Sequence, residues 1–342
     1  QTFSPSFFVS AKAAYYNTGF GLISRNPDQS YTYDYVAGQT VGNYYDYFPV
    51  RPQKTFDAAG NYFAQGLGGS HELKFGFGYR DVTTSTHYHW TGNQLVGYIN
   101  STTDQEARLY REGSPGAEGK YLNLYAGDVF TKDRLSINLG VRWDWQKARN
   151  TPASAPANAS FPDRLPGLEY AGDSSYPIDW KDFSPRVGLS YALDASQKTV
   201  ARASYARYAS QMQFTWVQDE NPVAPGYLAY GWNDANADRL VQPGEVVFSD
   251  FRGAVGIDPT NPAQAGSTPD KVDRDLRAPH TDEFIVGIDH ELLPSFAVGA
   301  AYTYRHISNL TYRPRLGGPC GADPSASSCR IIQPEEYTAN AP

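Results

Sequence analysis

Residues 134–145 alternate strictly between apolar and polar side chains. The odd positions from Leu135 to Trp145 are aliphatic or aromatic, and the even positions are Arg, Ser, Asn, Gly or Asp. A period of two puts the two sets on opposite faces of an extended strand. A chain built on this pattern forms strands that have one apolar and one polar face.

The same alternation recurs along the chain. It is clear in 72–80, 183–193 and 296–305 and weaker elsewhere. The pattern predicts about nine strands, at about 6–20, 52–67, 71–90, 120–131, 134–147, 182–193, 198–211, 278–292 and 296–309. The strand at 120–131 is ambiguous, because Asp128 falls on the same face as Leu122 and Leu124.

The connections between these strands alternate between short and long. Short turns fall at 68–70, 132–133, 194–197 and 293–295, where each joins two strands as a hairpin. Long polar connections occupy 21–51, 91–119, 148–181, 212–276 and 310–342. Short periplasmic turns and long extracellular loops are typical of an all-β, antiparallel transmembrane β-barrel of the outer membrane.

Aromatic residues support this interpretation. They make up 14% of the chain, and Trp143, Trp145, Tyr302 and Tyr304 lie at loop-side strand ends, where an interfacial girdle belongs. Helical membrane spans are excluded because no run of 18 apolar residues occurs. The net charge of −7 gives no support to nucleic-acid binding.

A soluble β-sandwich is the alternative, since it also alternates apolar and polar residues. Its loops would be short at both ends, and its core face would be rich in Leu, Ile and Val rather than Tyr, Ala and Gly. In the barrel, by contrast, the polar face lines the lumen. The lumen-facing residues that we predict are Lys74, Arg80, Arg142, Arg186 and Arg202.

The strand count predicts an incomplete barrel. Nine is odd, whereas bacterial single-chain barrels have even strand numbers. The chain also starts at Gln1 without an initiator Met or signal peptide and stops at Pro342 in a polar stretch. We therefore expect residues 1–342 to be a partial β-barrel domain, one portion of the wall of a larger barrel.

Five segments carry a family resemblance. They are 69–78 (GSHELKFGFG), 133–144 (DRLSINLGVRWD), 183–191 (FSPRVGLSY), 198–208 (KTVARASYARY) and 273–284 (DRDLRAPHTDEF). In their order and spacing, they resemble the barrel of a TonB-dependent outer-membrane receptor of the Oar-like subfamily. The resemblance implies a full chain that consists of a carboxypeptidase-regulatory-like β-domain, then a plug, and then a barrel of about 22 strands.

The resemblance implies energy-coupled uptake through a plugged barrel, with outer-membrane lipid, a plug domain and the TonB complex as partners and an unknown extracellular ligand. No TonB box, plug, N-terminal domain or closing strand is found in this sequence, so no transport residue carries over. Two alternatives stay open: a passive porin-like channel, and an adhesion or scaffold barrel that binds a partner through its loops. No catalytic motif is found, and we expect no enzyme.

One long connection contains the spacing of a calcium-binding loop. Asp or Asn occupies positions one, three and five, and Glu occupies position twelve. The departure is position six, usually Gly, which is Arg239 here and costs on the order of 1–2 kcal/mol in a left-handed conformation. A solvated acidic loop is the alternative. The candidate Ca²⁺ ligands are Asp234, Asn236, Asp238, Leu240, Gln242 and Glu245.

Three further features have weaker interpretations. Cys320 and Cys329 are the only cysteines, and a disulfide between them is favoured over two free thiols. His87 and His89 share a strand face, but no third metal ligand is placed by the sequence, so an interfacial or pore-rim pair is the better interpretation. The tyrosine-dense stretches 31–35 and 44–48 favour packing between loops over sugar or peptide contacts.

Overall fold

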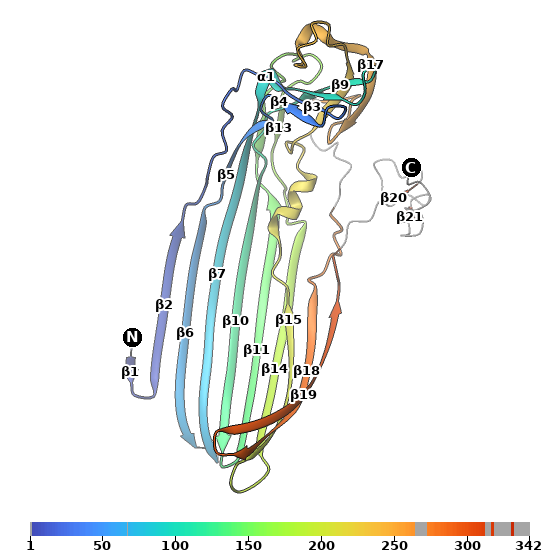
Figure 1. Cartoon of the computed structure of the whole chain (residues 1–342). Helices are drawn as coiled ribbons and strands as arrows, with labels where there is room; N and C mark the ends of the chain where they lie inside the picture. The colour runs from blue at the N-terminus through green and yellow to red at the C-terminus, as the bar shows by residue number, and fades with distance from the viewer. Residues whose placement is uncertain (1, 67, 264–271, 312–315, 318–329, 332–342) are drawn as a thin grey trace.

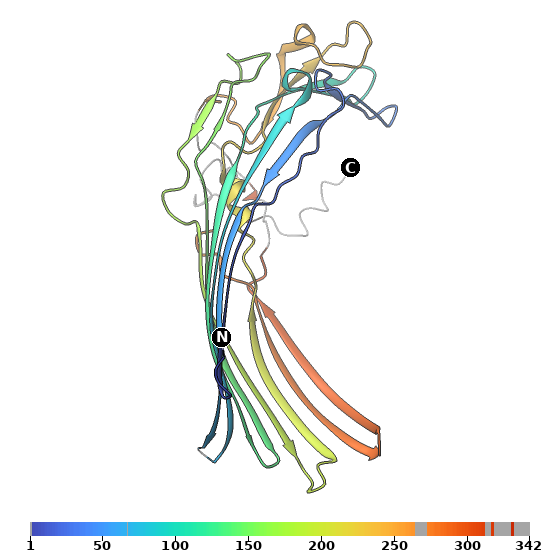
Figure 2. The same ribbon diagram turned by 90° about the vertical axis from the view of Figure 1, so that its left-hand side faces the viewer.

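The computed structural model of the chain describes residues 2–66, 68–263, 272–311, 316–317 and 330–331. One large antiparallel sheet forms a tall curved wall, and a smaller cap lies at one end of it (Figures 1 and 2). Among these residues, no helix is long and apolar enough to cross a membrane. Cys320 and Cys329 lie outside the described residues.

Nine strands follow one another across the wall, with β1 (Thr2–Ser4) beside the first and β5 (Tyr45–Val50) beside the third. These nine are β2 (Phe7–Tyr16), β6 (Gln53–Gly66), β7 (Gly69–Trp90), β10 (Gly116–Lys132), β11 (Leu135–Asn150), β14 (Ile178–Ala192), β15 (Thr199–Ala209), β18 (His280–Leu293) and β19 (Phe296–Ser308).

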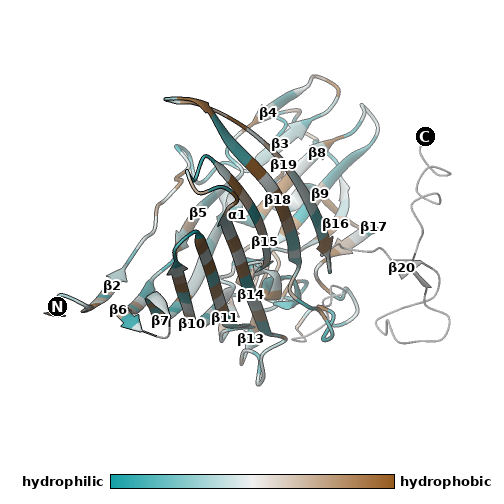
Figure 3. Cartoon of the chain, turned by 90° about the horizontal axis from the view of Figure 1, so that it is seen from below, coloured by the Kyte–Doolittle hydropathy of each residue, from teal (hydrophilic) through white to brown (hydrophobic). Residues whose placement is uncertain are grey.

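Strand register gathers the apolar side chains on one face of the wall. Phe77 pairs with Leu124, Leu124 with Trp143, and Trp143 with Phe183. The strands are banded brown and teal along their length, as the period of two requires (Figure 3). Leu124 and Phe183 keep 46% and 64% of their surface exposed, so no segment of the described residues covers this face there. An apolar face without cover suits contact with lipid.

The five predicted lumen residues all lie on the opposite, polar face. Lys74 and Arg80 are on β7, Arg142 is on β11, Arg186 is on β14 and Arg202 is on β15. Lys74 pairs with Gly127, Gly127 with Gly140, and Gly140 with Arg186. These residues of neighbouring strands therefore lie on the same face of the sheet. That this face lines the lumen of a closed barrel stays a prediction.

Tight turns close the hairpins at the end of the wall away from the cap. Asp133, Gln197 and Ser295 take positive φ values of 52°, 57° and 67° in three of these turns. Within the described residues the wall is open, with β1 and β2 at one edge and β19 at the other. The predicted all-β, antiparallel barrel architecture is confirmed.

The ambiguous Asp128 lies on the apolar face, where it is paired. His71 Nδ1 on the neighbouring strand is 2.7 Å from its Oδ2. The His71 ring also contacts the Phe130 ring, with centroids 5.0 Å apart. Both polar residues lie close to the hairpin turns, and their pairing satisfies one oxygen of the carboxylate among apolar neighbours.

The cap is built from the long connections. Its six strands run in the order β17-β16-β9-β8-β3-β4, and only β3 and β8 pair in parallel. They are β3 (Tyr31–Asp34), β4 (Gln39–Val41), β8 (Leu95–Ile99), β9 (Gln105–Tyr110), β16 (Tyr227–Trp232) and β17 (Val246–Val255). The remaining elements are α1 (Thr91–Gln94), η1 (Phe214–Glu220), η2 (Pro243–Glu245) and the short strands β12 (Ala153–Ala155), β13 (Leu168–Tyr170), β20 (Leu316–Gly317) and β21 (Arg330–Ile331).

Candidate functional site

Three of the long connections converge on one apolar core in the cap. Leu95 and Leu109 come from the connection after β7, Leu165 from the one after β11, and Leu228 from the one after β15. All four side chains are at most 2% exposed. The cap is therefore a folded platform that holds these connections in a fixed arrangement.

A cluster of aromatic rings joins the cap to the top of the wall. The Trp90 ring at the end of β7 stacks on Tyr110, with centroids 3.6 Å apart and planes inclined by 19°. Tyr44 and Tyr45 pack against Trp90 at 5.2 and 5.0 Å, and Tyr31 packs against Tyr44 at 4.7 Å. The tyrosine-dense stretches thus pack on one another and on the wall, as the sequence favoured.

Arg108 lies between two tyrosines at the edge of this cluster. Its guanidinium carbon is 3.9 Å from the Tyr98 ring centroid and 4.4 Å from that of Tyr227. Its Nε donates a 2.6 Å hydrogen bond to Glu106. The two rings and Glu106 together fix the conformation of the Arg108 side chain. Because Tyr98 is on β8, Arg108 on β9 and Tyr227 on β16, these contacts stiffen the three strands.

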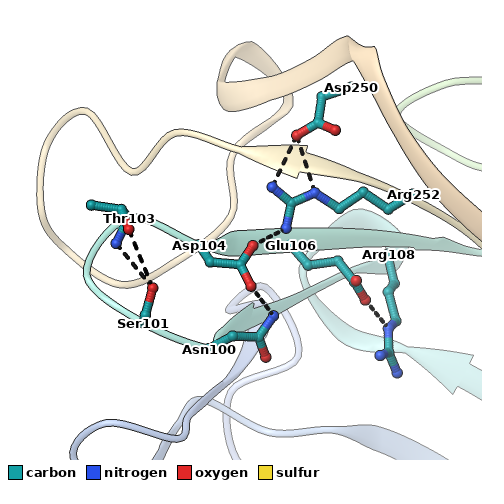
Figure 4. A network of polar contacts seen from close by, with 8 residues as sticks. All are labelled: Asn100, Ser101, Thr103, Asp104, Glu106, Arg108, Asp250 and Arg252. Carbon is teal, nitrogen blue, oxygen red and sulfur yellow. Dashed lines mark hydrogen bonds and ion pairs between the residues drawn. The ribbon is translucent and has the colours of Figure 1, made fainter.

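A second cationic residue, Arg252, ties β17 to the turn between β8 and β9 (Figure 4). It donates two hydrogen bonds to Asp250, from Nη2 at 2.9 Å and from Nε at 3.1 Å, and a further one to Asp104. Asn100 donates to the other oxygen of Asp104 at 3.2 Å. The network links two connections that lie about 150 residues apart in the chain.

This network is expected to make the turn between β8 and β9 sensitive to acid. The hydrogen bond from Arg252 lowers the pKa of Asp104 below its ordinary value of 3.8. A lowered carboxyl pKa adds stability above the unfolded pKa, and that stability is lost as the pH falls through the folded pKa, here below about pH 4. Asp104→Asn is expected to abolish this step for residues 100–105, at a cost of at most about 0.5 kcal/mol because the pair is exposed.

Hydrogen exchange between pH 3 and 6, corrected for its intrinsic pH dependence, measures the step. Asp28→Asn, at another exposed carboxylate in the same cap, is the control and is expected to leave the step in place. An acid step in the Asp104→Asn protein equal to that of the wild type would contradict the assignment.

The predicted calcium loop lies between β16 and β17 and closes on itself. Arg239, at position six, has φ of 63°, the left-handed value that the loop spacing requires. Its backbone N–H donates to Asp234 Oδ2 at 3.0 Å, and Ala235 N–H donates to Glu245 Oε1 at 3.2 Å. The first and last predicted ligands thus lie at the two ends of one compact turn.

The loop side chains are engaged with one another. Asn236 Nδ2 donates to Asp238 and to Gln242, each at 3.0 Å. Asp234 Oδ1 is buried and has no hydrogen-bond partner among the described residues. Within the same described part of the chain, no three His, Cys, Asp or Glu side chains converge as a preformed metal cage. An ion would have to displace the Asn236 and Gln242 contacts.

His87 and His89 each contact a different partner on the outer face of β7. His87 Nδ1 is 3.0 Å from Ser114 Oγ, and His89 Nδ1 pairs with Glu112. Neither contact involves the other histidine. That the two histidines form an interfacial or pore-rim pair stays a prediction.

A polar cavity of about 410 Å³ opens on the polar face of the wall, where the strands approach the cap. Arg80 lies over the Tyr121 ring at 3.9 Å, and Arg142 binds both oxygens of Asp144, at 2.8 to 3.0 Å. Asp57 also lines the cavity. The sequence predicted the two arginines. The contact of Arg80 with Tyr121 follows from strand register, whereas Asp144 lies two residues after Arg142 on the same face of β11.

Carboxylates also face one another beside this cavity. Asp144 and Asp182 are directly opposite on β11 and β14. Asp182 Oδ2 is buried and accepts no hydrogen bond within the described part of the chain. The cavity therefore presents both guanidinium and carboxylate groups, which suits a polar or charged solute better than an apolar one.

Comparison with known proteins adds a family. The family described as "Outer membrane beta barrel domain" matches residues 8–338. No curated protein matches the chain.

Three solved structures show similarity at low identity. The siderophore receptor PiuA from Acinetobacter baumannii has 14% identity and a TM-score of 0.42, covering 96% of this chain and 47% of its own. The unliganded ferric citrate transporter FecA has 11% identity and a TM-score of 0.39, and the match covers 89% of this chain and 41% of FecA. The outer membrane transporter YddB from Escherichia coli has 11% identity and a TM-score of 0.29, and the match covers 89% of this chain and 45% of YddB. The chain spans less than half the length of each of them.

Proposed function

The chain belongs to the outer membrane beta barrel domain family, and on that premise we propose that it forms part of the wall and cap of a TonB-dependent receptor of the Oar-like subfamily. The protein is located in the bacterial outer membrane. In the proposed receptor, the cap captures an extracellular ligand, and the polar face of the wall meets a plug domain. Uptake is coupled to energy from the TonB complex.

The observation that carries this proposal is the polar cavity on the polar face of the wall, where the connection after β15 begins. A solute held by the cap reaches the polar face beside Arg80 and Arg142, on the side of the wall away from lipid. The five sequence segments that resemble TonB-dependent receptors lie in the wall or at its entry. A simple adhesion barrel has no need of such a cavity beneath its loops.

A solute-depletion experiment tests the proposal while the ligand is still unidentified. Native cells and cells lacking the gene are incubated in a complex medium, with and without a protonophore, and solute loss is followed by mass spectrometry. We expect at least one polar solute to be depleted by native cells alone, and only when the membrane is energised.

Two results would contradict the proposal. Steady ion conductance of the purified full-length protein in planar bilayers without energy would indicate a passive channel. Identical solute depletion by both strains, with loss of surface binding on removal of 212–276, would indicate an adhesion barrel.

We also propose that the loop from Asp234 to Glu245 binds Ca²⁺ and stiffens the cap. The left-handed conformation of Arg239 and the unpartnered Asp234 Oδ1 support it. Bound Ca²⁺ would draw oxygens from Asp234, Asn236, Asp238 and Glu245, with the Leu240 carbonyl and Gln242 as the remaining candidates. Glu245 already receives hydrogen bonds from Trp232, Ala235 and Gln242, so it is oriented toward the loop.

Calorimetry of the full-length protein with CaCl₂ measures this binding. Glu245→Gln is expected to weaken Ca²⁺ binding about tenfold or more, because it removes a charged and potentially bidentate ligand. Glu169→Gln, at an exposed cap carboxylate, is the matched control and is expected to bind like the wild type. An absence of calcium heat in the wild type, or an equal loss in both variants, would end the proposal.

A further inference from the structure

A row of charged side chains crosses five strands on the outer face of the wall, just below the cap. Lys54 pairs with Asp81, Asp81 with Lys120, Lys120 with Lys147, and Lys147 with Asp179. These pairings place all five side chains at one height. Each member of the row is separated from an apolar residue of its own strand by an even number of positions. The row therefore lies on the same face of the wall as the apolar side chains.

The next row toward the membrane centre is aromatic and apolar. Phe56, Tyr79, Leu122 and Trp145 pair in order, and the row ends at Lys181. Aromatic belts of this kind lie at the level of lipid headgroups. The charged row therefore lies at the outer edge of the apolar face, where headgroups meet water.

The acidic groups near this row already have partners. Glu118 accepts hydrogen bonds from Arg149 at 2.6 Å and from Tyr176 at 2.9 Å, and it lies 3.8 Å from Lys120 Nζ. Asp179 accepts from Trp145 Nε1 at 2.6 Å, and Asp81 accepts from Tyr79 at 3.4 Å.

Three ammonium groups are left over. Within the described residues, no carboxylate lies within ion-pair distance of Lys54, Lys147 or Lys181. The outer edge of the apolar face thus carries an excess of positive charge.

Aromatic rings hold two of these cations in place. Lys147 Nζ lies 4.4 Å from the Trp145 ring centroid and 4.2 Å from that of Tyr176. Lys181 Nζ lies 5.8 Å from Trp145. Lys120 and Lys147 are also directly opposite each other, a like-charge pairing that destabilises a sheet unless an anion lies between them.

The row faces outward and not into the lumen. On the same strands, the alternate residues Ala117, Ala148 and Ile178 are buried against the segment that includes Met212 and Val217. A ligand for the lysines therefore arrives from the membrane side. At this level, the available anion is the headgroup of a lipid in the outer leaflet.

We propose that a set of five cations, which we call the outer lysine row, binds the phosphate groups of an outer-leaflet glycolipid. It consists of Lys54, Lys120 and Lys147 from the charged row, Lys181 from the aromatic row below and Arg149 from the row above. A phosphate between Lys120 and Lys147 relieves their repulsion, while the acyl chains lie on the apolar face below. The site is on the outside of the wall, so it is independent of the uptake pathway.

Native mass spectrometry of the delipidated full-length protein with bisphosphorylated lipid A tests the site. The double variant Lys120→Gln/Lys147→Gln is expected to bind about tenfold more weakly. Lys120→Arg/Lys147→Arg keeps the charge and is expected to bind like the wild type. Dephosphorylated lipid A is expected to bind the wild type about as weakly as intact lipid A binds the double Gln variant.

Two control variants complete the design. Lys132→Gln lies on the same face near the hairpin turns, and Lys74→Gln lies on the opposite face. Both are expected to change binding less than about twofold. Equal weakening by Lys132→Gln, or equal binding of dephosphorylated lipid A, would overturn the site. Displacement of lipid A by an equal concentration of inorganic phosphate would overturn the lipid assignment, because the two would then bind equally well and the acyl chains would add nothing.

Discussion

Replacement of Val141 by arginine is expected to destabilise the full-length protein in phospholipid vesicles by about 2–4 kcal/mol. Val141 lies on the apolar face of β11, opposite Ala126 and Pro185, and keeps 41% of its surface exposed. An arginine there meets hydrocarbon without a partner. Urea titration of the folded fraction in vesicles measures the loss.

Asn138→Arg is the matched control, because Asn138 is exposed on the polar face of the same strand. It is expected to cost less than about 0.5 kcal/mol. Equal costs at the two positions, or a greater cost at Asn138, would show that the apolar face is not the lipid face. The two-faced interpretation of the wall would then be wrong.

Replacement of Trp90 by alanine is expected to loosen the cap by about 3–5 kcal/mol while the wall stays folded. Trp90 is 3% exposed and stacks on Tyr110, so its loss leaves a large cavity where β7 enters the cap. Hydrogen exchange with mass spectrometry is the measurement. Peptides from β3, β8 and β9 are expected to lose protection, and peptides from the membrane-spanning parts of β10 and β11 are not.

Tyr35→Ala is the control for this variant. Tyr35 lies in the same cap and packs on Tyr33 at 4.5 Å, but it is 58% exposed. Its removal is expected to change the protection of the cap by less than about 1 kcal/mol. A uniform loss of protection in wall and cap after Trp90→Ala would mean that the two do not unfold separately.

The wall was predictable from sequence because one of its faces is apolar along the strands and the other is polar. From Leu135 to Trp145 every second residue meets the apolar side, so the period of two is unbroken. At the loop ends the strands run further than predicted: β10 begins at Gly116 and β11 ends at Asn150. There Ala117 and Ala148 are buried against the segment around η1, a contact that local alternation does not reveal.

The cap could not be predicted in the same way. In β3 the buried residues are the polar Thr32 and Asp34, and the neighbouring tyrosines are only partly buried. Asp34 is buried because its Oδ1 accepts hydrogen bonds from the N–H groups of Val36 and Ala37, each at 2.9 Å. The parallel pairing of β3 with β8 also joins segments that are far apart in the chain, and no local pattern marks it.

The candidate sites show the same division. The facing of Arg80 and Arg142 follows from the period of two, whereas Asp57 and Tyr121 enter the same cavity through strand register. The outer lysine row arises in the same manner, since Lys120 and Lys147 become neighbours only when β10 and β11 pair. Chemistry that depends on one strand was visible in the sequence, and chemistry shared between strands was not.

The most direct test of the account is the intact mass of the native protein in purified outer membranes, identified by peptides from this sequence. We expect a chain about two to three times heavier than 37.8 kDa, with room for a plug and the remaining strands of a large barrel. A mass near 37.8 kDa would contradict it, because the proposed receptor would then have neither a plug nor enough strands to enclose one.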